Sequence, residues 1–329
     1  MSLSVNDLVA GYGGTPLLGP LNLTLPSGRF VCLIGANGAG KSTLIRTLCG
    51  MQPALAGSVH IDGRALDRLS ARERAQTLSV VLTERVANSM MSGYELASLG
   101  RYPHIGWGGR LSPQDHDMVR ESLAQAGASA LASRLVVEMS DGERQKIMIA
   151  RALAQQPRLL VLDEATAFLD LPRRIETMQL LLDLARTQRL AVLLSTHDLE
   201  LALRYADTLW LIDGERQVNV GAPEDLAISG VLGRTFSAEG LCFDLERGEL
   251  RVGQQGTCAI RLEGSGIRAT WAARALQRAG YEVHAEAPLC VRVDQTHFHL
   301  HGKDDAQPFD SMHALVEVLL RARETGTAA

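Results

Sequence analysis

Short apolar runs recur along the first two thirds of the chain, separated by segments whose apolar residues follow helical spacing. The clearest runs cover residues 30–34, 159–162 and 190–194. Runs of this length, bounded by polar residues, are typical of strands that are buried on both faces. The alternation of such strands with helices predicts an α/β fold with a mostly parallel sheet and helices on both of its sides.

Capping residues mark the starts of several helices. Ser140 and Glu143 have the spacing of a capping box, so Ser140 is expected to open a helix. Ser112-Pro113 predicts a second helix start, and Gly127 predicts the end of that helix. Pro172 predicts the start of a third helix. One face of the third helix is expected to carry Ile175, Met178, Leu182 and Ala185.

Shorter elements are predicted before and after these strands and helices. Residues 3–31 and 57–62 have the pattern of short strands around turns, which predicts an antiparallel subdomain. Residues 209–215 indicate the entry to a hairpin, residues 223–236 a helix, and residues 241–252 a final pair of strands.

A linker at Gly253-Gln254-Gln255-Gly256 divides the sequence into a large domain, residues 1–252, and a small domain, residues 253–329. The small domain has the α+β pattern of a sheet with helices over one face. Its expected strands cover residues 258–262, 281–285, 289–293 and 296–301, and its expected helices cover residues 268–279 and 311–323. A chain of 329 residues has room for both domains.

Charge, cysteine content and apolar segments argue against several classes of protein. A net charge of −4 offers no electrostatic basis for binding nucleic acid. The N-terminus lacks the basic and apolar stretches of a secretory signal, and no segment approaches the roughly 18 apolar residues of a membrane span. The cysteines are scattered without a C-x-x-C pair, which is typical of a reducing cytosol. They are Cys32, Cys49, Cys242, Cys258 and Cys290.

The strongest chemical signal is the segment Gly35-Ala36-Asn37-Gly38-Ala39-Gly40-Lys41-Ser42-Thr43. It fits the P-loop pattern and lies between a predicted strand and a predicted helix, as that motif requires. Its glycines let backbone N–H groups close around phosphate oxygens, and the helix N-terminus adds a favourable dipole. Lys41 can neutralise β- and γ-phosphate charge, and Ser42 can offer a hydroxyl to Mg²⁺. The alternative is a glycine-rich turn between a strand and a helix.

A pair of carboxylates, Asp163-Glu164, follows the apolar run at residues 159–162. At the C-terminal end of a parallel strand, Asp163 is expected beside the P-loop, where it can hold Mg²⁺ directly or through water. Glu164 can polarise the water that attacks the nucleotide. The alternative is a strand followed by an acidic helix cap.

Two further motifs have a fixed order relative to these. Met139-Ser140-Asp141-Gly142-Glu143-Arg144-Gln145 precedes the carboxylate pair, and Ser195-Thr196-His197-Asp198 follows it. The ordered set resembles the ATP-binding subunits of ABC transporters over roughly residues 3–252. In that family the serine–glycine motif, here Ser140 and Gly142, is the signature sequence, which reaches across a dimer to the γ-phosphate of the partner's nucleotide. The alternative is that Ser140 only caps its helix.

The resemblance assigns roles to three more residues. Tyr12 matches the aromatic residue that stacks on adenine. Asp170 matches the loop that crosses the dimer interface, although Ala167 stands where the family more often has serine. His197 matches the histidine that contacts the γ-phosphate and links it to the catalytic water. The signature is expected in a helical subdomain at about residues 84–157.

Two positions depart from the family pattern. Thr83 stands where the family usually has the glutamine that joins the nucleotide to the membrane subunits. Its hydroxyl can still reach Mg²⁺ or a water, but it carries no amide, and Glu84 could substitute if the metal offsets repulsion from the triphosphate. Asp141 stands where glycine is commoner, so its charge must point away from the γ-phosphate.

The resemblance implies an ABC-type ATPase that works as a homodimer, with two ATP–Mg²⁺ between the P-loop of one chain and the signature of the other. Gly100-Arg101-Tyr102-Pro103 resembles the importer class for iron–siderophore, haem and cobalamin. The implied partners are transmembrane permease subunits and, indirectly, a periplasmic or surface substrate-binding protein. The implied location is peripheral, at the cytoplasmic face of the inner (plasma) membrane.

Two alternative functions stay open. The chain could be a soluble ABC ATPase of DNA repair or translation, although such proteins usually have two cassettes or a long coiled-coil insertion, and the sequence shows neither. It could also be an ATP-binding regulator whose turnover is lost because of Thr83.

The small domain has no catalytic constellation in its sequence and is expected to be a regulatory or dimer-stabilising appendage. His297, His299 and His301 alternate along a predicted strand, so they are expected on one face. Adjacent histidines could share a metal, with His284 as a further ligand. The favoured alternative is a solvated strand face, because alternate residues of a strand lie about 6.6 Å apart, which is wide for three ligands of one ion.

Overall fold

The computed structural model describes residues 2–82, 90–106, 109–237, 241–245, 248–252, 258–301 and 306–324. Contacts divide the chain into two compact units. Unit 1 comprises Met1–Phe236 and Asp244–Glu249, and unit 2 comprises Ser237–Phe243 and Leu250–Ala329. The domain boundary expected between residues 252 and 253 stays a prediction.

The core of unit 1 is a six-stranded sheet in the order β10-β9-β3-β8-β7-β6. All neighbouring strands are parallel except β9 and β10, which form the hairpin predicted from residues 209–215. The bounds are β3 Phe30–Gly35, β6 Leu78–Val81, β7 Leu159–Asp163, β8 Ala191–Ser195, β9 Thr208–Ile212 and β10 Val218–Gly221. Every residue of β3, β7 and β8 is buried, which agrees with the three apolar runs. The predicted α/β fold is therefore confirmed.

The predicted antiparallel subdomain is a four-stranded sheet in the order β2-β1-β4-β5. Its bounds are β1 Ser2–Tyr12, β2 Thr15–Pro26, β4 Ala56–Ile61 and β5 Arg64–Ala65. The expectation of short strands over residues 3–31 is wrong, because β1 and β2 have 11 and 12 residues. Gly13 and Gly14, with φ of 55° and 81°, make the turn between them, and shifts of register along the pair let the long strands bend.

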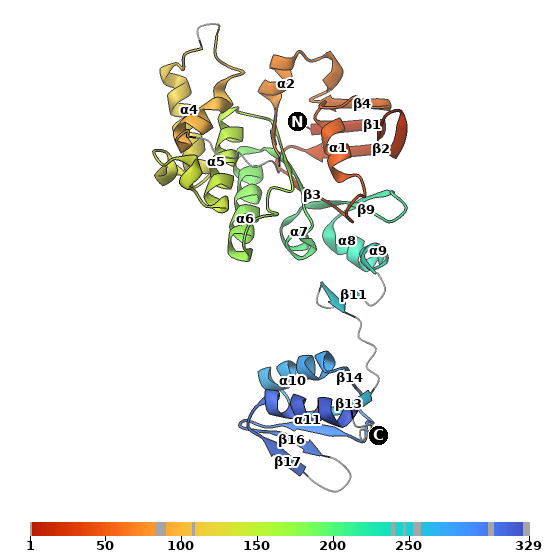
Figure 1. The fold of residues 1–329 in the computed structure, drawn as a ribbon. Helices are drawn as coiled ribbons and strands as arrows, with labels where there is room; N and C mark the ends of the chain where they lie inside the picture. The colour runs from red at the N-terminus through yellow and green to blue at the C-terminus, as the bar shows by residue number, and fades with distance from the viewer. Residues whose placement is uncertain are drawn as a thin grey trace. The chain divides into compact units, whose positions relative to one another are not determined.

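Helices flank the central sheet, and α4 and α5 lie side by side at one end of unit 1 (Figure 1). The α-helices of unit 1 are α1 Lys41–Leu48, α2 Ala71–Thr77, α3 Gly93–Ser98, α4 Pro113–Gln125, α5 Asp141–Ala154, α6 Leu171–Gln188, α7 Leu199–Tyr205, α8 Pro223–Ile228 and α9 Val231–Phe236. Short 3₁₀ helices are η1 Leu66–Arg68, η2 Leu99–Arg101, η3 Ser129–Leu131 and η4 Val136–Glu138. The predicted helical subdomain consists of α3, α4 and α5, which pack against one another.

The helix starts at Ser112 and Ser140 are confirmed, since each serine makes a complete capping box. The four residues that were predicted on one face of α6 are all at least half-buried. Met178 and Ala185 are buried, but Ile175 and Leu182 are only half-buried. The other residues that α6 buries are Thr177, Leu181 and Leu184.

The prediction of a single helix at residues 223–236 is wrong. Gly230 has a φ of 75°, in the left-handed region, and it separates α8 from α9.

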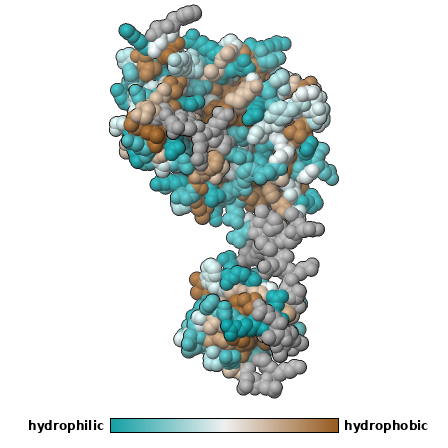
Figure 2. Space-filling view, in the orientation of Figure 1, coloured by the Kyte–Doolittle hydropathy of each residue, from teal (hydrophilic) through white to brown (hydrophobic). Residues whose placement is uncertain are grey.

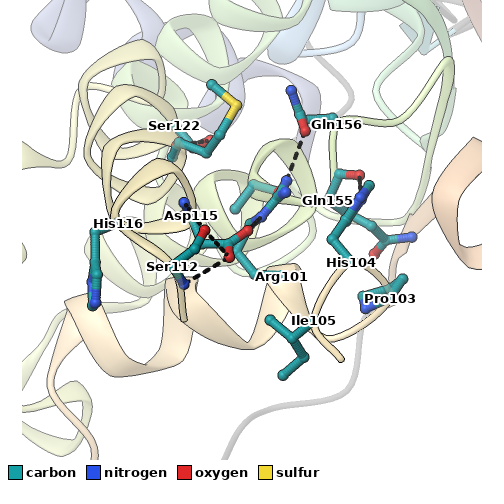
Figure 3. A network of polar contacts seen from close by, with 12 residues as sticks. Arg101, Pro103, His104, Ile105, Ser112, Asp115, His116, Ser122, Gln155 and Gln156 are labelled. Carbon is teal, nitrogen blue, oxygen red and sulfur yellow. Dashed lines mark hydrogen bonds and ion pairs between the residues drawn. The ribbon is translucent and has the colours of Figure 1, made fainter. Parts of the chain in front are cut away.

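A buried polar network holds the helical subdomain together (Figure 3). The Nε of Arg101 donates to Oδ1 of Asp115 at 2.9 Å, and its Nη1 donates to the carbonyl of Ala154 at 2.7 Å and to Gln156 at 2.8 Å. Ser112 donates its N–H and its hydroxyl to the other oxygen of Asp115. Arg101 therefore joins the N-terminus of α4 to the C-terminus of α5.

Unit 2 contains a five-stranded sheet in the order β14-β13-β15-β16-β17. Its bounds are β13 Cys258–Glu263, β14 Tyr281–Val283, β15 Cys290–Val293, β16 Phe298–His301 and β17 Ala306–Phe309, with α10 Ile267–Arg278 and α11 Met312–Glu324. Ala272 and Leu276 of α10 and Leu315 and Leu319 of α11 enter one apolar core with this sheet. The α+β arrangement is confirmed, and β17 is a strand that the sequence did not predict.

The predicted strand pair near residue 245 is present as β11 Leu241–Asp244 and β12 Glu249–Val252, which form a separate two-stranded sheet. Within the described ranges, no helix is both long enough and apolar enough to cross a membrane. On the face shown in Figure 2, polar residues are interspersed with small apolar patches in each unit.

Candidate functional site

The P-loop joins the end of β3 to the start of α1. Gly38 and Gly40 have φ of 78° and 109°, in the left-handed region that favours glycine. A Cβ on Gly35 would lie 2.9 Å from the carbonyl oxygen of Ile212, and a Cβ on Gly40 would lie 3.0 Å from two leucine side chains. The loop backbone can therefore keep this curvature only with glycine at these positions. Its shape suits the cradle of N–H groups that a phosphate needs.

Lys41 is the first residue of α1 and is buried. Its Nζ donates to the carbonyls of Gly35 and Ala36, at 2.9 and 3.1 Å. Burial lowers the pKa of Lys41, and the negative charges of Glu164 and Asp163 raise it in part. In the sheet, β8 is the parallel neighbour of both β3 and β7, so the carboxylates that follow β7 lie at the same edge as the P-loop, as the strand order predicts.

Asp163 and Ser195 are partners in the register of β7 and β8. The hydroxyl of Ser195 donates to Oδ1 of Asp163 at 2.6 Å and accepts the N–H of Glu164 at 2.9 Å. Asp163 is buried, so this hydroxyl fixes its orientation. Ser195 was not predicted to have a role. Its place at the end of the strand beside Asp163 is the signal that could have identified it.

Glu164 and His197 lie together just beyond the sheet edge. His197 Nε2 is 2.5 Å from Glu164 Oε1, and both side chains are partly exposed. Glu164 has a φ of 50°, a left-handed conformation that is uncommon for residues other than glycine. The pair opens on a pocket of about 200 Å³. Its lining residues are Glu164, Thr166, Ala167, Arg174, Thr196, His197 and Asp198.

Tyr12 ends β1 and is about half exposed, at 53%. Its hydroxyl accepts a hydrogen bond from Arg46 at 3.3 Å. A hydrogen bond with the Thr43 side chain, and then Arg46, lowers the pKa of Tyr12. Because Thr43 and Arg46 belong to α1, the ring of Tyr12 is held near the first turn of that helix, with a face free to meet solvent or a base.

Ser140 and Gly142 lie at the N-terminus of α5, and neither lines the pocket at Glu164. The hydroxyl and N–H of Ser140 donate to Glu143, and its oxygen accepts the N–H of Glu143 at 3.3 Å. Asp141 lies 3.5 Å from Arg144, which offsets its charge. Asp170 caps α6 by accepting the N–H of Arg173 at 3.0 Å. These residues thus form helix starts that are largely exposed and lie outside the lining of the pocket at Glu164.

Thr83 and Glu84 lie outside the described residues, so their expected contact with Mg²⁺ stays a prediction. Ser42 in the first turn of α1 and Asp163 at the end of β7 offer a hydroxyl and a carboxylate, the hard oxygen ligands that Mg²⁺ prefers. The two donors and the glycine cradle therefore fit a Mg²⁺–nucleotide.

Two histidines of unit 2, His297 and His299, pair with carboxylates. His299 Nε2 is 2.8 Å from Asp294, and His297 Nε2 is 3.3 Å from Asp310. Neighbouring rings are separated by 6.1 and 6.3 Å between centroids. Across the part of the chain that the structure covers, no three His, Cys, Asp or Glu side chains are grouped to hold a metal. His297, His299 and His301 are half-buried, and Nε2 of His301 is buried without a hydrogen-bond partner among the described residues, so the solvated strand face stays a prediction.

The fold and the site define a P-loop ATPase of the cassette type. Comparison with known proteins makes this specific. Residues 18–167 match the ABC transporter family, and residues 257–320 match the iron ABC transporter C-terminal domain. A solved structure of cbiO1 from Clostridium perfringens, part of the ABC transporter complex cbiONQ, has a TM-score of 0.62 and 25% identity, covering 70% of this chain and 92% of that chain.

Three relatives show how far the similarity extends. An uncharacterized ABC transporter ATP-binding protein of Methanocaldococcus jannaschii is 42% identical over 224 residues, which cover 68% of this chain and 77% of that protein. The iron(3+)-hydroxamate import ATP-binding protein FhuC of Bacillus subtilis is 33% identical over 238 residues, 72% of this chain and 88% of that protein. The cobalamin import ATP-binding protein BtuD of Halobacterium salinarum is 32% identical over 291 residues, 86% of this chain and 73% of that protein.

This chain belongs to the ABC transporter ATP-binding family, whose members bind and hydrolyse ATP.

Proposed function

We propose that the chain is the ATP-hydrolysing subunit of a membrane ABC importer that takes up an iron–siderophore, haem or cobalamin. The observation that supports this most directly is the match of residues 257–320 to the iron ABC transporter C-terminal domain. Relatives named for iron(3+)-hydroxamate and cobalamin import support the same class of cargo. Two copies of the chain would act with transmembrane permease subunits, peripherally at the cytoplasmic face of the membrane, and a binding protein would deliver the cargo from outside.

In this proposal the P-loop holds the triphosphate. Backbone N–H groups of Asn37, Gly38 and Gly40 surround the phosphates, and Lys41 turns its ammonium from the loop carbonyls toward the β- and γ-phosphates. Tyr12 stacks on adenine, and Thr43 lies in the first helical turn beside the phosphates. Ser42 and Asp163, with Thr83, would hold Mg²⁺, which neutralises charge on the phosphates.

Hydrolysis in the proposal depends on Glu164 and His197. Glu164 accepts a proton from, or polarises, the attacking water, while His197 holds the carboxylate in place and contacts the γ-phosphate. The trans contacts come from the partner chain, whose Ser140 and Gly142 would close over the γ-phosphate while its Asp170 meets the interface. The exposed helix start at Ser140 supports such a contact, because the positive dipole end of α5 lies at the surface, where an anion of the partner's site can meet it.

Transport measurements in cells test the proposal. A strain that lacks this chain would be complemented with the wild type or with Glu164→Gln, and uptake of radiolabelled ferric hydroxamate, haem and cobalamin would be measured. We expect one of the three uptakes to be lost on deletion and restored only by the wild type. If all three uptakes proceed normally without the chain, the importer proposal is wrong.

A further inference from the structure

Arg174 lies in α6, one turn beyond Asp170, and reaches the segment that carries His197. Its backbone N–H donates to the carbonyl of Asp170 at 2.9 Å. Its Nη1 donates to Oδ2 of Asp198 at 2.9 Å. The same side chain lines the pocket of Glu164 and His197. The backbone of Arg174 therefore belongs to the first turns of the helix that Asp170 caps, while its side chain reaches the neighbour of His197.

Asp198 makes hydrogen bonds to residues before and after it in the chain, and these bonds hold the segment around His197. The other carboxylate oxygen of Asp198 accepts the N–H of Leu201 at 3.1 Å and caps α7. The backbone N–H of Asp198 donates to the hydroxyl of Thr196 at 3.1 Å. These two contacts set the local turn, but both lie within residues 196–201. Arg174 supplies a tie from a different element, so it can fix where the turn lies relative to α6.

Partial burial strengthens the ion pair between Arg174 and Asp198. The side chains of Arg174 and Asp198 are 36% and 17% exposed, so solvent screens this pair less than it screens a pair of fully exposed side chains. The Nε of Arg174 is buried and has no hydrogen-bond partner within the described residues. Holding this group in the pocket wall costs free energy, and the ion pair at the other end of the guanidinium offsets that cost.

We propose that Arg174 is a positioning residue for hydrolysis: through Asp198 it holds His197 where Nε2 meets Glu164, and it links this pair to the helix start at Asp170. The inference rests on the proposed roles of Glu164 and His197. Without the guanidinium, the turn keeps its cap but loses its tie to α6, and His197 samples positions away from Glu164. Small displacements of positioned catalytic groups reduce turnover strongly. ATP binding should change little, because Lys41 and Tyr12 lie on other elements.

Steady-state ATPase kinetics and ATP binding of the full chain test this with Arg174→Gln, Arg174→Lys and Asp198→Asn. The matched control is Arg186→Gln, which removes another arginine of α6 that pairs with an aspartate, Asp207, at 3.2 Å. We expect Arg174→Gln to lower kcat about tenfold with KM and ATP affinity nearly unchanged. The Lys variant should recover part of kcat, and the Arg186 variant should match the wild type.

The double variant Arg174→Gln/Asp198→Asn shows whether the two residues affect kcat through their ion pair or independently of each other. If the two residues act as one pair, the double variant should be no slower than the slower single variant. Fully multiplicative losses would overturn the proposal, as would an unchanged kcat in Arg174→Gln. Loss of ATP affinity in that variant would make Arg174 a ligand-binding residue instead. If Arg174→Gln does not fold, the comparison of kcat between Arg174→Lys and Arg186→Lys tests the proposal instead. Normal turnover in Glu164→Gln would refute the catalytic role of Glu164 on which the inference rests, independently of the result for Arg174, and loss of the importer function would show in the uptake measurements instead.

Discussion

His197 Nε2 lies 2.5 Å from Glu164 Oε1, although 33 positions separate the two residues in the chain. Two features of the backbone create this contact. β7 and β8 are parallel neighbours that end together, with Asp163 beside Ser195. The left-handed backbone of Glu164 then turns its side chain out of the strand direction, toward the loop that follows β8. The carboxylate and the imidazole are thus positioned by the two strands that precede them.

The first prediction concerns Glu164→Gln. Glutamine keeps the size of the side chain and a hydrogen bond to His197, but it cannot accept a proton from water. We expect ATP binding to persist and the ATPase rate to fall by at least about 100-fold, with an ATP-stabilised dimer detectable by light scattering. Glu121→Gln, on an exposed face of α4, is the control that should keep normal turnover. Near-normal turnover in pure Glu164→Gln protein would remove Glu164 from its proposed role.

The second prediction separates binding from chemistry at the P-loop. Lys41→Ala removes the ammonium that would contact the β- and γ-phosphates. Hydrogen bonds to charged groups contribute about 1.5–3 kcal/mol, so ATP affinity should weaken by roughly 10- to 100-fold. Equilibrium binding of a fluorescent ATP analogue measures this directly. An unchanged affinity would show that Lys41 remains on the carbonyls of Gly35 and Ala36 when nucleotide is bound.

The sequence allowed the P-loop, Asp163, Glu164 and His197 to be placed at one sheet edge, because each follows an apolar run that could only be a buried parallel strand. Ion pairs between elements that are distant in the sequence could not be predicted. Arg174 and Asp198 are 24 positions apart, and no periodic pattern connects them. The sequence did not predict β17 because Pro308 disfavours a strand. The proline is accepted there because β17 lies at the edge of the sheet. The break at Gly230 was missed because glycine is tolerated within a helical pattern.

The third prediction concerns acid stability. Hydrogen bonds from Ser112, and then Arg101, lower the pKa of Asp115 to about 2. The folded-state pKa lies below the unfolded value, so the stabilisation is present above about pH 4 and is lost as pH falls toward 2. It amounts to about 2 kcal/mol. Urea titrations should therefore show a steeper loss of stability between pH 4 and pH 2 for the wild type than for Asp115→Asn. Equal slopes would contradict the shifted carboxylate.

The fourth prediction concerns Ser140 at the dimer interface. Ser140→Ala and Ser70→Ala each remove one capping-box hydroxyl, with an expected cost of about 1 kcal/mol. Only the Ser140 variant should weaken ATP-driven association of the Glu164→Gln chain, because only Ser140 would meet the partner's phosphate. Analytical ultracentrifugation with ATP compares the two. Equal association of both variants would mean that Ser140 caps α5 and does nothing in trans.

Mixing two variants gives a second test of the proposed contact between Ser140 and the partner's phosphate. Lys41→Ala chains and Ser140→Arg chains, each with Glu164→Gln, should form heterodimers with one intact site. We expect partial ATP-dependent association in the mixture and almost none in either variant alone. Association that is unaffected when every chain carries Ser140→Arg would contradict the trans contact.

The last prediction concerns the C-terminal part of the chain. The sites described for nucleotide chemistry all lie in unit 1, up to His197 and Asp198, whereas the apolar core of unit 2 is formed by its own strands and by α10 and α11. A chain that ends at Val252 should therefore fold, bind ATP with unchanged affinity, and differ in dimerisation or in basal ATPase rate. Calorimetry with ATP and size-exclusion chromatography measure both properties. A matched full-length variant, Leu276→Ala, removes a fully buried side chain of α10 and should perturb unit 2 by about 2–5 kcal/mol without deleting it. A truncated protein that is folded but no longer binds ATP would show that this segment contributes to the nucleotide site, and its interpretation as a regulatory or dimer-stabilising appendage would be wrong.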